Sequence, residues 1–376
     1  MIYQNAVFYN FRNFTEIEAE FNPGINIFVG QNGQGKTNLL EGLFLLTQGD
    51  SFRYGDNEAF IYNSKGDASL RSRILNDDLS WDLQLQILKS RKNHLANDKK
   101  ITSAACSEKF PVIIFSPESL SAIKEGDDQR RQLVDSLLTT THPGMSQTIA
   151  DYRRALRSRN KMLKNLLEGL ASETETRLLL ESINPTFLKL ATQLTLARIE
   201  ALRAIQPELN EAMRSISKQA DVDILVDYVI SSKSGINYDR NAILNALQNR
   251  LHELTQAELA AGSTLVGPHK HDISFLYNQN DSRFFCSQGQ QRALILSFKM
   301  AQIVYHRRVH KSEPVLILDD VLSELDFDKR SALITFLSGV GTQIFISTTE
   351  MNLSAELRTK DLAVFKIANG KICDEI

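Results

Sequence analysis

The stretch GQNGQGKT, from Gly30 to Thr37, constrains the fold of this chain more than any other feature of its sequence. It fits the phosphate-loop pattern G-x-x-x-x-G-K-[ST] and lies between an apolar strand candidate, INIFV, and an apolar helix pattern that begins near Lys36. Glycines let such a loop curl so that its backbone N–H groups face phosphate oxygens at a helix N-terminus, which favours anions. The alternative is a glycine-rich turn with an exposed lysine, and it leaves the flanking strand and helix patterns unexplained.

Every residue of this loop is a candidate nucleotide ligand. The set is Gly30, Gln31, Asn32, Gly33, Gln34, Gly35, Lys36 and Thr37. We expect Lys36 to reach the β- and γ-phosphates, which makes it a catalytic candidate as well, and Thr37 to ligate Mg²⁺. The cofactors predicted from the loop are therefore ATP and Mg²⁺.

A second motif supplies the expected partner for the metal. In VLILDD, four apolar residues precede Asp319, and Asp320 follows directly. Because phosphate-loop ATPases hold Mg²⁺ with an acid of this kind, we expect Asp319 to bind the metal through water. Asp320 is then the catalytic candidate that polarises the attacking water. The alternative is that two acids simply mark the end of a strand.

The segment SQGQQR opens directly onto an apolar helical pattern. Ser287 offers a hydroxyl, Gly289 permits close approach, and the N-terminal end of a helix favours an anion. In one class of ATPase such a helix start binds the γ-phosphate of a nucleotide held by a second subunit. We therefore expect Ser287, Gln288 and Gly289 to contact the ATP of another copy of the chain. The alternative is a surface helix with Ser287 as its N-cap.

The apolar pattern changes twice along the chain. Residues 1–120 and 262–376 carry mixed strand and helix signals, as in an α/β fold, whereas residues 121–261 are mainly helical. Since neither flank looks like a complete sheet, we expect the two to combine into one ATPase head with the helical domain inserted.

Within the helical segment, apolar residues recur with a 3.5-residue period from Met145 to Leu170, with Arg159 in one slot, and again from Phe187 to Ala201. This period favours two helices paired as a short antiparallel arm. Ordinary packing of a helical subdomain is the alternative.

Bulk composition narrows the class of protein. A formal net charge of −2 gives no global positive excess, so any surface for nucleic acid has to be local. Cys106, Cys286 and Cys373 have neither disulfide nor zinc spacing, and the N-terminus lacks the layout of a signal peptide. No apolar run approaches the ~18 residues of a membrane span. We expect a cytoplasmic protein without a membrane partner.

Taken in order, these motifs resemble the RecF family, the short members of the ABC-type and SMC-like ATPases. The matching stretches span nearly the whole chain and are NFRNF, GQNGQGKTNLLEGL, SFR, IIFSPESL, RRQLVD, RSRNKMLK, GPHKHD, SQGQQR, LDDVLSELD and IFISTTE. SQGQQR followed by LDDVLSELD is the most specific pair. The resemblance implies an α/β, ABC-type ATPase head with a helical arm.

The resemblance also implies a function, which is ATP-dependent DNA binding in recombinational repair and replication-fork maintenance. ATP would drive two chains into a homodimer that grips duplex DNA near single-stranded gaps and junctions. Weak ATP hydrolysis would release the DNA. RecO and RecR would be the partners that help to load recombinase.

Several residue roles follow from the resemblance alone. Ser323, Glu324, Leu325 and Asp326 would form a loop that crosses the dimer interface. Thr348 or Thr349 stands where related ATPases place a γ-phosphate-sensing residue, commonly histidine. Asp320 stands where many ABC ATPases carry glutamate, and its shorter side chain predicts slow hydrolysis. Residues 116–118 occupy about the place of the glutamine that usually joins the two lobes. Arg53 would contact nucleotide or close the dimer.

Basic residues gather in DYRRALRSRNKMLK, which holds six basic residues and one acid. The candidate DNA contacts are Arg153, Arg154, Arg157, Arg159, Lys161 and Lys164. Such a helix would track phosphates without reading sequence. A second basic locus lies in LKSRKNH and NDKK, near a strand end. The alternative is an ordinary solvated helix face.

Three other functions are compatible with parts of the pattern. A transporter ATPase subunit would share the phosphate loop, but there the SQGQQR-like segment lies much closer to the loop, without so long a helical arm. A non-hydrolysing interaction module would keep the fold without the chemistry. A helicase motor is disfavoured because the sequence shows no second tandem ATPase core.

Overall fold

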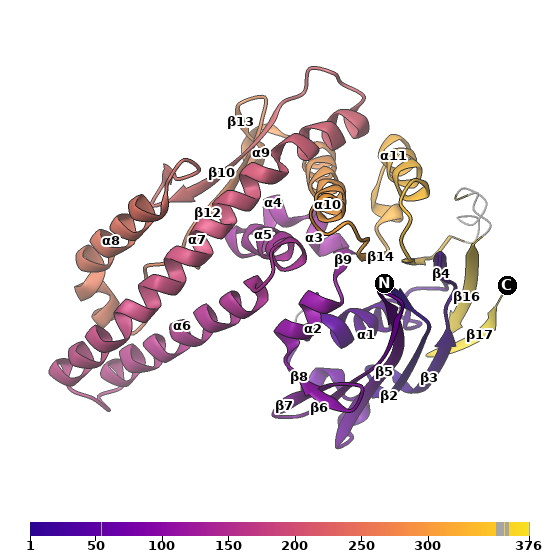
Figure 1. The fold of residues 1–376 in the computed structure, drawn as a ribbon, viewed down its shortest axis with the longest axis horizontal. Coiled ribbons are helices and arrows are strands. Elements are labelled where there is room, and N and C mark those ends of the chain that lie inside the picture. Colours follow the sequence, from indigo (N-terminus) through magenta and orange to yellow (C-terminus); the bar gives the residue numbers. More distant parts are fainter. Residues whose placement is uncertain (54, 351–356, 358–360, 376) are drawn as a thin grey trace. The chain divides into compact units, whose positions relative to one another are not determined.

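The fold is that of a computed structural model, which describes every residue except 54, 351–356, 358–360 and 376 (Figure 1). The chain forms two compact units, each assembled from segments that are distant in sequence. Unit 1 contains Met1–Ser121, Glu211–Asp221 and Ser287–Ile376, and unit 2 contains Ala122–Asn210 and Val222–Cys286.

A six-stranded sheet in unit 1 combines the two ends of the chain. Its strands, in the order β17-β16-β4-β15-β14-β9, are β17 (Lys371–Glu375), β16 (Leu362–Ala368), β4 (Ile25–Val29), β15 (Ile344–Thr348), β14 (Val315–Asp319) and β9 (Val112–Phe115). All neighbours are parallel except β16 and β17. Strands β4, β9, β14 and β15 are buried at every residue, which explains their continuous apolar sequences. The prediction that both flanks share one ATPase head is confirmed.

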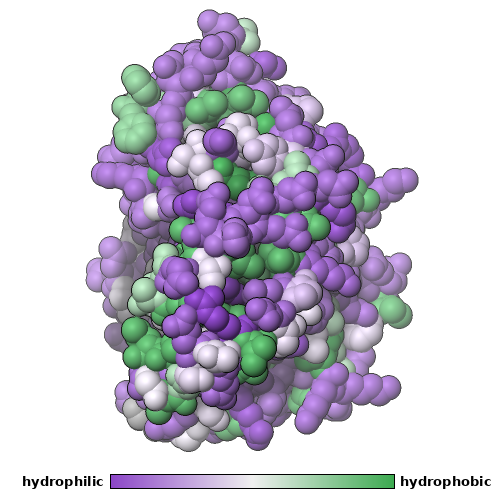
Figure 2. Space-filling model, turned by 90° about the vertical axis from the view of Figure 1, so that its left-hand side faces the viewer, coloured by the Kyte–Doolittle hydropathy of each residue, from purple (hydrophilic) through white to green (hydrophobic). Residues whose placement is uncertain are grey.

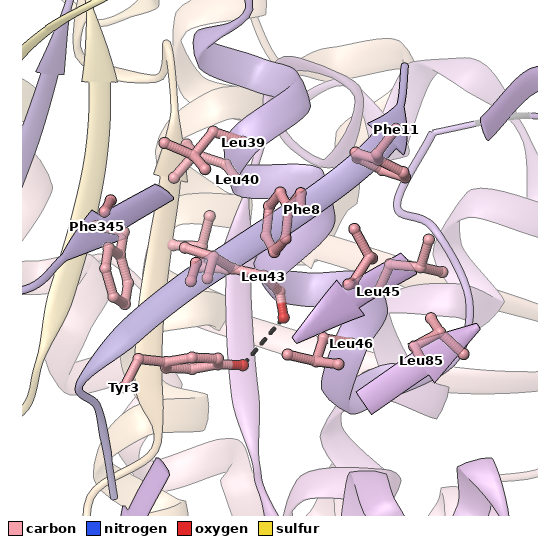
Figure 3. Packing of buried hydrophobic residues seen from close by; sticks show 14 of the residues in the cluster. Tyr3, Phe8, Phe11, Leu39, Leu40, Leu43, Leu45, Leu46, Leu85 and Phe345 are labelled. Atoms are coloured by element: carbon pink, nitrogen blue, oxygen red, sulfur yellow. Dashed lines mark hydrogen bonds between the residues drawn. The ribbon is translucent and has the colours of Figure 1, made fainter. Parts of the chain in front are cut away.

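A second, antiparallel sheet belongs to the same unit. It contains β1 (Ile2–Tyr3), β2 (Asn5–Phe11), β3 (Phe14–Glu20), β5 (Asp67–Asn76), β6 (Leu79–Leu88), β7 (Arg91–Ala96) and β8 (Lys99–Ile101). Helix α1 (Lys36–Gln48) contacts strands of both sheets, and its leucines fill the space between them. Figure 3 shows this core, in which the Tyr3 hydroxyl donates to Leu43 O at 3.0 Å. The same hydroxyl lies 3.1 Å from Thr47 Oγ1, so a buried polar group is satisfied inside an apolar core.

Unit 1 also contains helices that precede or follow strands of its two sheets. They are η1 (Glu58–Phe60), η2 (Tyr62–Ser64), α2 (Ser103–Lys109), α3 (Pro117–Leu120), α10 (Gln288–His310), η3 (Leu322–Glu324) and α11 (Phe327–Ser338). Helix α10 is buried along most of its length, from Ala293 to Ile303, as its apolar sequence predicts.

Unit 2 surrounds a small antiparallel sheet with helices. The sheet has the order β11-β10-β12-β13, and its strands are β10 (Ile224–Ile230), β11 (Lys233–Ser234), β12 (Asp272–Tyr277) and β13 (Asn280–Asp281). The helices are α4 (Ala122–Glu125), α5 (Asp127–Thr141), α6 (Met145–Leu167), most of α7 (Glu173–Ser217), α8 (Arg240–Ala261) and α9 (Ser282–Phe285).

Helices α6 and α7 run antiparallel, as the 3.5-residue period predicted. Side-chain contacts join Thr148 to Gln193 and Tyr152 to Phe187. Nearer the turn between the helices, Arg159 contacts Asn184. As the residue numbers on α6 increase, the residue numbers of the contacting residues on α7 decrease, which is the order that antiparallel helices require. Figure 1 shows the two helices side by side.

The expected domain boundaries differ from the compact units. Residues 262–376 were expected in the head, whereas 262–286 belong to unit 2 and the head resumes at Ser287. The reason is that β12 pairs with β10 along six residue pairs, Ile224↔Tyr277 to Val229↔Asp272, which fixes this segment to the arm's own sheet. Residues 211–221, expected in the helical domain, belong to unit 1.

Surface polarity agrees with the absence of membrane-spanning helices in the described part of the chain. Figure 2 shows one face of the molecule, on which hydrophilic residues predominate and hydrophobic residues form small separate groups. Within the described residues no helix combines the length and the apolar character that a bilayer crossing requires.

Candidate functional site

The phosphate loop joins the buried strand β4 to helix α1, as the sequence predicted. Gly33 and Gly35 have φ angles of 80° and 114°, a backbone region that glycine occupies at little cost. A Cβ atom on Gly35 would lie 2.7 Å from Asn13 Nδ2, and one on Gly30 would lie 2.3 Å from Ile367 O. Backbone conformation therefore favours glycine at Gly33, space requires it at Gly30, and both apply at Gly35.

Gln34 connects the loop to the hairpin between β16 and β17. Its backbone oxygen accepts from Gly370 N at 3.0 Å, and its Oε1 accepts from Asn369 N at 2.6 Å. The Gln34 side chain, one of the predicted nucleotide ligands, therefore holds the hairpin. Its backbone N–H remains the group suited to a phosphate contact.

Lys36 is buried at the first position of α1, and its ammonium contacts the backbone of the loop that precedes the helix. Nζ donates to Gly30 O at 2.7 Å and to Gln31 O at 2.9 Å. Burial lowers the pKa of Lys36, while the carboxylates of Asp320 and Asp319 oppose that shift. Loop, ammonium and both acids of the LDD motif therefore belong to one electrostatic site.

Thr37, in the first turn of α1, meets Asp319 at the carboxyl end of β14, which β15 separates from β4 in the sheet. Thr37 Oγ1 donates to Asp319 Oδ1 at 2.8 Å, and Ser347 Oγ donates to the same oxygen at 2.7 Å. Burial raises the pKa of the Asp319 carboxyl, the hydrogen bonds from Ser347 and Thr37 counteract this, and the charges of Glu118 and Asp320 add to the rise. A nearby cation would stabilise the charged form of this buried carboxylate. A hydroxyl group beside such a carboxylate is a donor set that fits Mg²⁺.

Asp320 directly follows β14 in a left-handed backbone conformation, with φ of 50°. Its N–H donates to Ser347 Oγ at 2.9 Å, and Ser323 Oγ lies 2.8 Å from its backbone oxygen and 3.1 Å from Oδ1. Asp and Asn tolerate this conformation better than most residues. The expected catalytic carboxylate is therefore oriented by the first residue of the predicted interface loop.

Ser287 is the N-cap of α10. Its Oγ accepts from Gln290 N at 3.3 Å, and Gln290 Oε1 accepts from Ser287 N at 2.9 Å, which completes a capping box. The alternative interpretation, in which Ser287 is an N-cap, therefore describes part of this structure. This cap does not use the hydroxyl proton of Ser287, which stays available to donate.

The predicted interface loop, Ser323–Asp326, is fixed to the start of α10. Arg292 Nη1 donates to Glu324 O at 2.8 Å, and Arg292 Nη2 pairs with Glu324 Oε2 at 2.7 Å. Asp326 caps α11 by accepting from Lys329 N at 3.1 Å. Helix start and loop form one continuous surface of unit 1.

One predicted DNA contact is wrong. Arg159 is 2% exposed, pairs with Glu258 at 2.6 Å, and donates to Thr264 Oγ1 at 2.9 Å. It holds α6 against the other arm helices, and its place in an apolar slot of the period was the signal for this. The other five candidates, Arg153, Arg154, Arg157, Lys161 and Lys164, are exposed.

A buried carboxylate near the loop had no recognisable signal in the sequence. Glu41 on α1 is fully buried and accepts from Arg12 through both oxygens, at 2.9 Å and 2.7 Å. Ser51 also donates to Glu41, and Arg53 Nη1 lies 3.7 Å from it while donating to Asn38 Oδ1 at 3.1 Å. Arg53, whose role was left open, is thus held beside the first turn of α1.

Two further predicted positions have local roles. Thr348 Oγ1 accepts from Glu350 N at 3.0 Å, whereas Ser347, one residue earlier, contacts Asp319. Ser116 caps α3 with Ser119, and Glu118 follows close enough to Asp319 to affect its pKa. A switch role for Thr348 or Thr349 and a lobe-joining role for 116–118 stay predictions.

Comparison with known proteins gives consistent matches over the whole chain. Residues 4–372 match the family described as RecF/RecN/SMC N terminal domain. The DNA replication and repair protein RecF of Heliobacterium modesticaldum (strain ATCC 51547 / Ice1) is 32% identical over 365 residues, 96% of each chain. RecF of Listeria monocytogenes serotype 4b (strain CLIP80459) is 32% identical over 374 residues, 98% of each chain.

Solved structures show the same relationship. A recombination mediator protein RecF with ATP, from the RecFOR pathway, has a TM-score of 0.86 and 28% identity, covering 100% of this chain and 97% of that one. The Smc head domain of Pyrococcus furiosus has a TM-score of 0.56 at 12% identity, covering 100% and 96%, which supports the ATPase-head fold alone. The extent and identity of these matches exclude the transporter alternative, and the chain belongs to the RecF family of DNA replication and repair proteins.

Proposed function

We propose that the chain is an ATP-dependent DNA-binding switch, acting in the cytoplasm in recombinational repair and at replication forks. The observation that carries the proposal is the contact of Thr37 Oγ1 with Asp319 Oδ1 at 2.8 Å beside the buried Lys36, in a RecF-family chain. In P-loop ATPases these three positions hold the phosphates and the metal.

ATP would lie along Gly30–Thr37, with loop N–H groups and Lys36 on its phosphates. Thr37 and Asp319 would hold Mg²⁺, which neutralises phosphate charge when it is bound. Lys36 would exchange its contacts with Gly30 O and Gln31 O for phosphate oxygens, which bind an ammonium more strongly than neutral carbonyls do.

Two copies would close head to head when ATP binds. Ser287, Gln288 and Gly289 of one copy would then face the ATP of the other, and residues 323–326 would cross the interface. The unused hydroxyl proton of Ser287 and the rigid connection from Arg292 to Glu324 support this arrangement.

Slow hydrolysis would reset the switch. Asp320 would accept a proton from, or orient, the attacking water, and Ser323 would hold its carboxylate in place. A short side chain in a constrained left-handed conformation reaches less far than glutamate would. This favours a weak ATPase that times DNA release over a motor.

DNA would contact exposed cations of the arm. Arg153, Arg157 and Lys161 are spaced four residues apart on α6 and are all exposed, so they lie along one helix face. Such a stripe suits phosphates of duplex DNA or of a junction with single strands. The relatives' place in the RecFOR pathway supports recombination mediators of the RecR and RecO type as partners.

Light scattering tests the switch directly. Wild type and Ser287→Arg would be weighed with and without Mg-ATP. The proposal expects ATP to double the mass of wild type only, since arginine would block the shared site. A wild-type mass that ignores ATP, or normal dimerisation of Ser287→Arg, would refute the shared-site mechanism.

A further inference from the structure

Two hydrogen-bond donors lie beside Gly289, at ordinary contact distance from the position that a Cβ atom would occupy. A Cβ atom built on Gly289 would lie 3.5 Å from Lys329 Nζ and 3.9 Å from Ser287 Oγ. Within the described part of the chain, these are the only heavy atoms that it would meet within 4 Å outside the neighbouring residues and the backbone of its own helix. A glycine here therefore leaves a gap that faces an ammonium and a hydroxyl.

Lys329 is held in this position from two sides. It lies in the first turn of α11, where its N–H donates to Asp326 Oδ1 at 3.1 Å and its ammonium pairs with Asp326 Oδ2. Its side chain is only 18% exposed, although α11 lies at the surface. The ion pair with Arg292 fixes Glu324, so the loop that carries Asp326 keeps its place relative to α10.

The three groups around the gap are all donors. The Ser287 oxygen accepts from Gln290 N, a hydrogen bond that does not use the hydroxyl proton. The first N–H groups of α10 have no acceptor within the helix. Lys329 adds an ammonium, paired in this structure with Asp326, and charge-assisted hydrogen bonds to an anion are stronger than neutral ones.

We infer that Lys329 is a further ligand of the γ-phosphate of the ATP held by a second copy of the chain. This inference rests on the proposed function and deepens it, because it adds a cation to a site so far composed of a serine and a helix end. Asp326 acts as a positioning residue that keeps the ammonium at the gap until the phosphate arrives.

Mixing two inactive variants tests whether Lys329 acts across the dimer. Lys36→Met removes the phosphate-loop cation, and Lys329→Gln removes the proposed trans cation. A mixed dimer then has one fully damaged site and one intact site, formed by the Lys329→Gln copy's loop and the Lys36→Met copy's Lys329. We expect each variant alone to lose ATP turnover roughly 100-fold, as for a lost transition-state donor. Turnover of the mixture should exceed the sum of the two.

A matched lysine provides the control. Lys218 pairs at 2.7 Å with Asp328, the neighbour of Lys329 in α11, but the Lys218 side chain is 67% exposed. Lys218→Gln should keep wild-type turnover and ATP-dependent mass, and Lys329→Arg should keep part of both because it retains the charge. Thermal melting of each variant checks that the fold is kept.

The outcomes separate this inference from the proposed function. If Lys329→Gln behaves as wild type while Ser287→Arg fails to dimerise, the inference is overturned and the switch stands. A second result would also overturn the inference. In it, turnover does not recover when Lys329→Gln is mixed with Lys36→Met, but does recover when Ser287→Arg is mixed with Lys36→Met. If the molar mass of wild type does not change when ATP is added, the inference about Lys329 and the proposed switch are both refuted.

Discussion

Thr37 Oγ1 lies 2.8 Å from Asp319 Oδ1, although the two residues are 282 positions apart. The parallel sheet produces this contact, because β15 separates β4 from β14 by a single strand and all three end at the same edge. Ser347, at the end of β15, donates to the same Asp319 oxygen. Three consecutive strands of the sheet therefore assemble the corner at which we propose that Mg²⁺ binds, and changes at any of them should alter metal dependence before they alter the fold.

Asp319→Asn should remove the carboxylate charge that we propose binds the metal, and should leave the shape of the side chain nearly unchanged. We expect Mg-dependent ATP turnover to fall at least ~100-fold, because several kcal/mol of charge stabilisation depend on the metal. Melting temperature gives the second readout: Mg-ATP should stabilise wild type more than ATP with EDTA does, and this difference should vanish in the variant. Thr37→Ser, which keeps the hydroxyl, is the control that should retain the difference. Unchanged Mg dependence in Asp319→Asn would remove this residue from the metal site.

Asp320→Asn should separate ATP binding from ATP hydrolysis. Asparagine tolerates the left-handed φ of 50°, so the loop keeps its conformation. Loss of a general base typically lowers turnover by roughly 10²–10⁴-fold. The ATP-dependent dimer should therefore persist longer than that of wild type, measured by light scattering after removal of free ATP, while phosphate release nearly stops. A variant that hydrolyses ATP at the wild-type rate would show that another group activates the water.

The two loop glycines should respond differently to alanine. Both have positive φ, which costs an alanine about 1–2 kcal/mol. At Gly35 the methyl group would also meet Asn13 Nδ2 at 2.7 Å, whereas at Gly33 no atom lies within 4 Å. Gly35→Ala should lose more stability in urea unfolding and more nucleotide affinity than Gly33→Ala. Equal losses would mean that backbone strain alone decides, and that the Asn13 side chain moves aside freely.

The sequence predicted the site better than it predicted the arm. The loop, Lys36 and Thr37 form a short-range pattern in which strand, turn and helix follow one another, and Asp319 ends a separate apolar strand pattern, so each can be recognised locally. The boundary between the two units at Ser287 depends on the pairing of β10 with β12 across more than 40 residues, and no local sequence pattern indicates such pairing. Ser347 was missed for a similar reason: it reads as an ordinary strand residue until the register places it opposite Asp319.

Arg159 and Arg157 should separate arm stability from DNA binding. Arg159→Met leaves Glu258 buried without its partner, a loss of about 3–5 kcal/mol in the free energy of unfolding. Arg157→Met removes an exposed charge and should leave stability almost unchanged, while DNA affinity falls and the slope of log affinity against log salt drops by ~1. Urea unfolding and fluorescence anisotropy at several salt concentrations measure the two effects. A flat salt response in wild type would exclude α6 as a phosphate-tracking surface.

The buried histidines of unit 2 should make the protein sensitive to mild acid. Burial, together with nearby cations, lowers the pKa of His269 to about 4 and of His271 to about 3, from 6.5. Above pH 6.5 both are neutral in folded and unfolded chains, so their contribution is fully present. As pH falls below 6.5, the unfolded chain binds protons that the folded chain excludes, and stability drops by about 1.4 kcal/mol per pH unit for each histidine. Urea unfolding at pH 7.5 and 5.5 should show this loss in wild type and in the exposed control His252→Gln. The loss should be smaller in His271→Gln, which starts less stable because Tyr228 loses one of its hydrogen-bond partners. An equal loss in all three would assign the acid sensitivity to other groups.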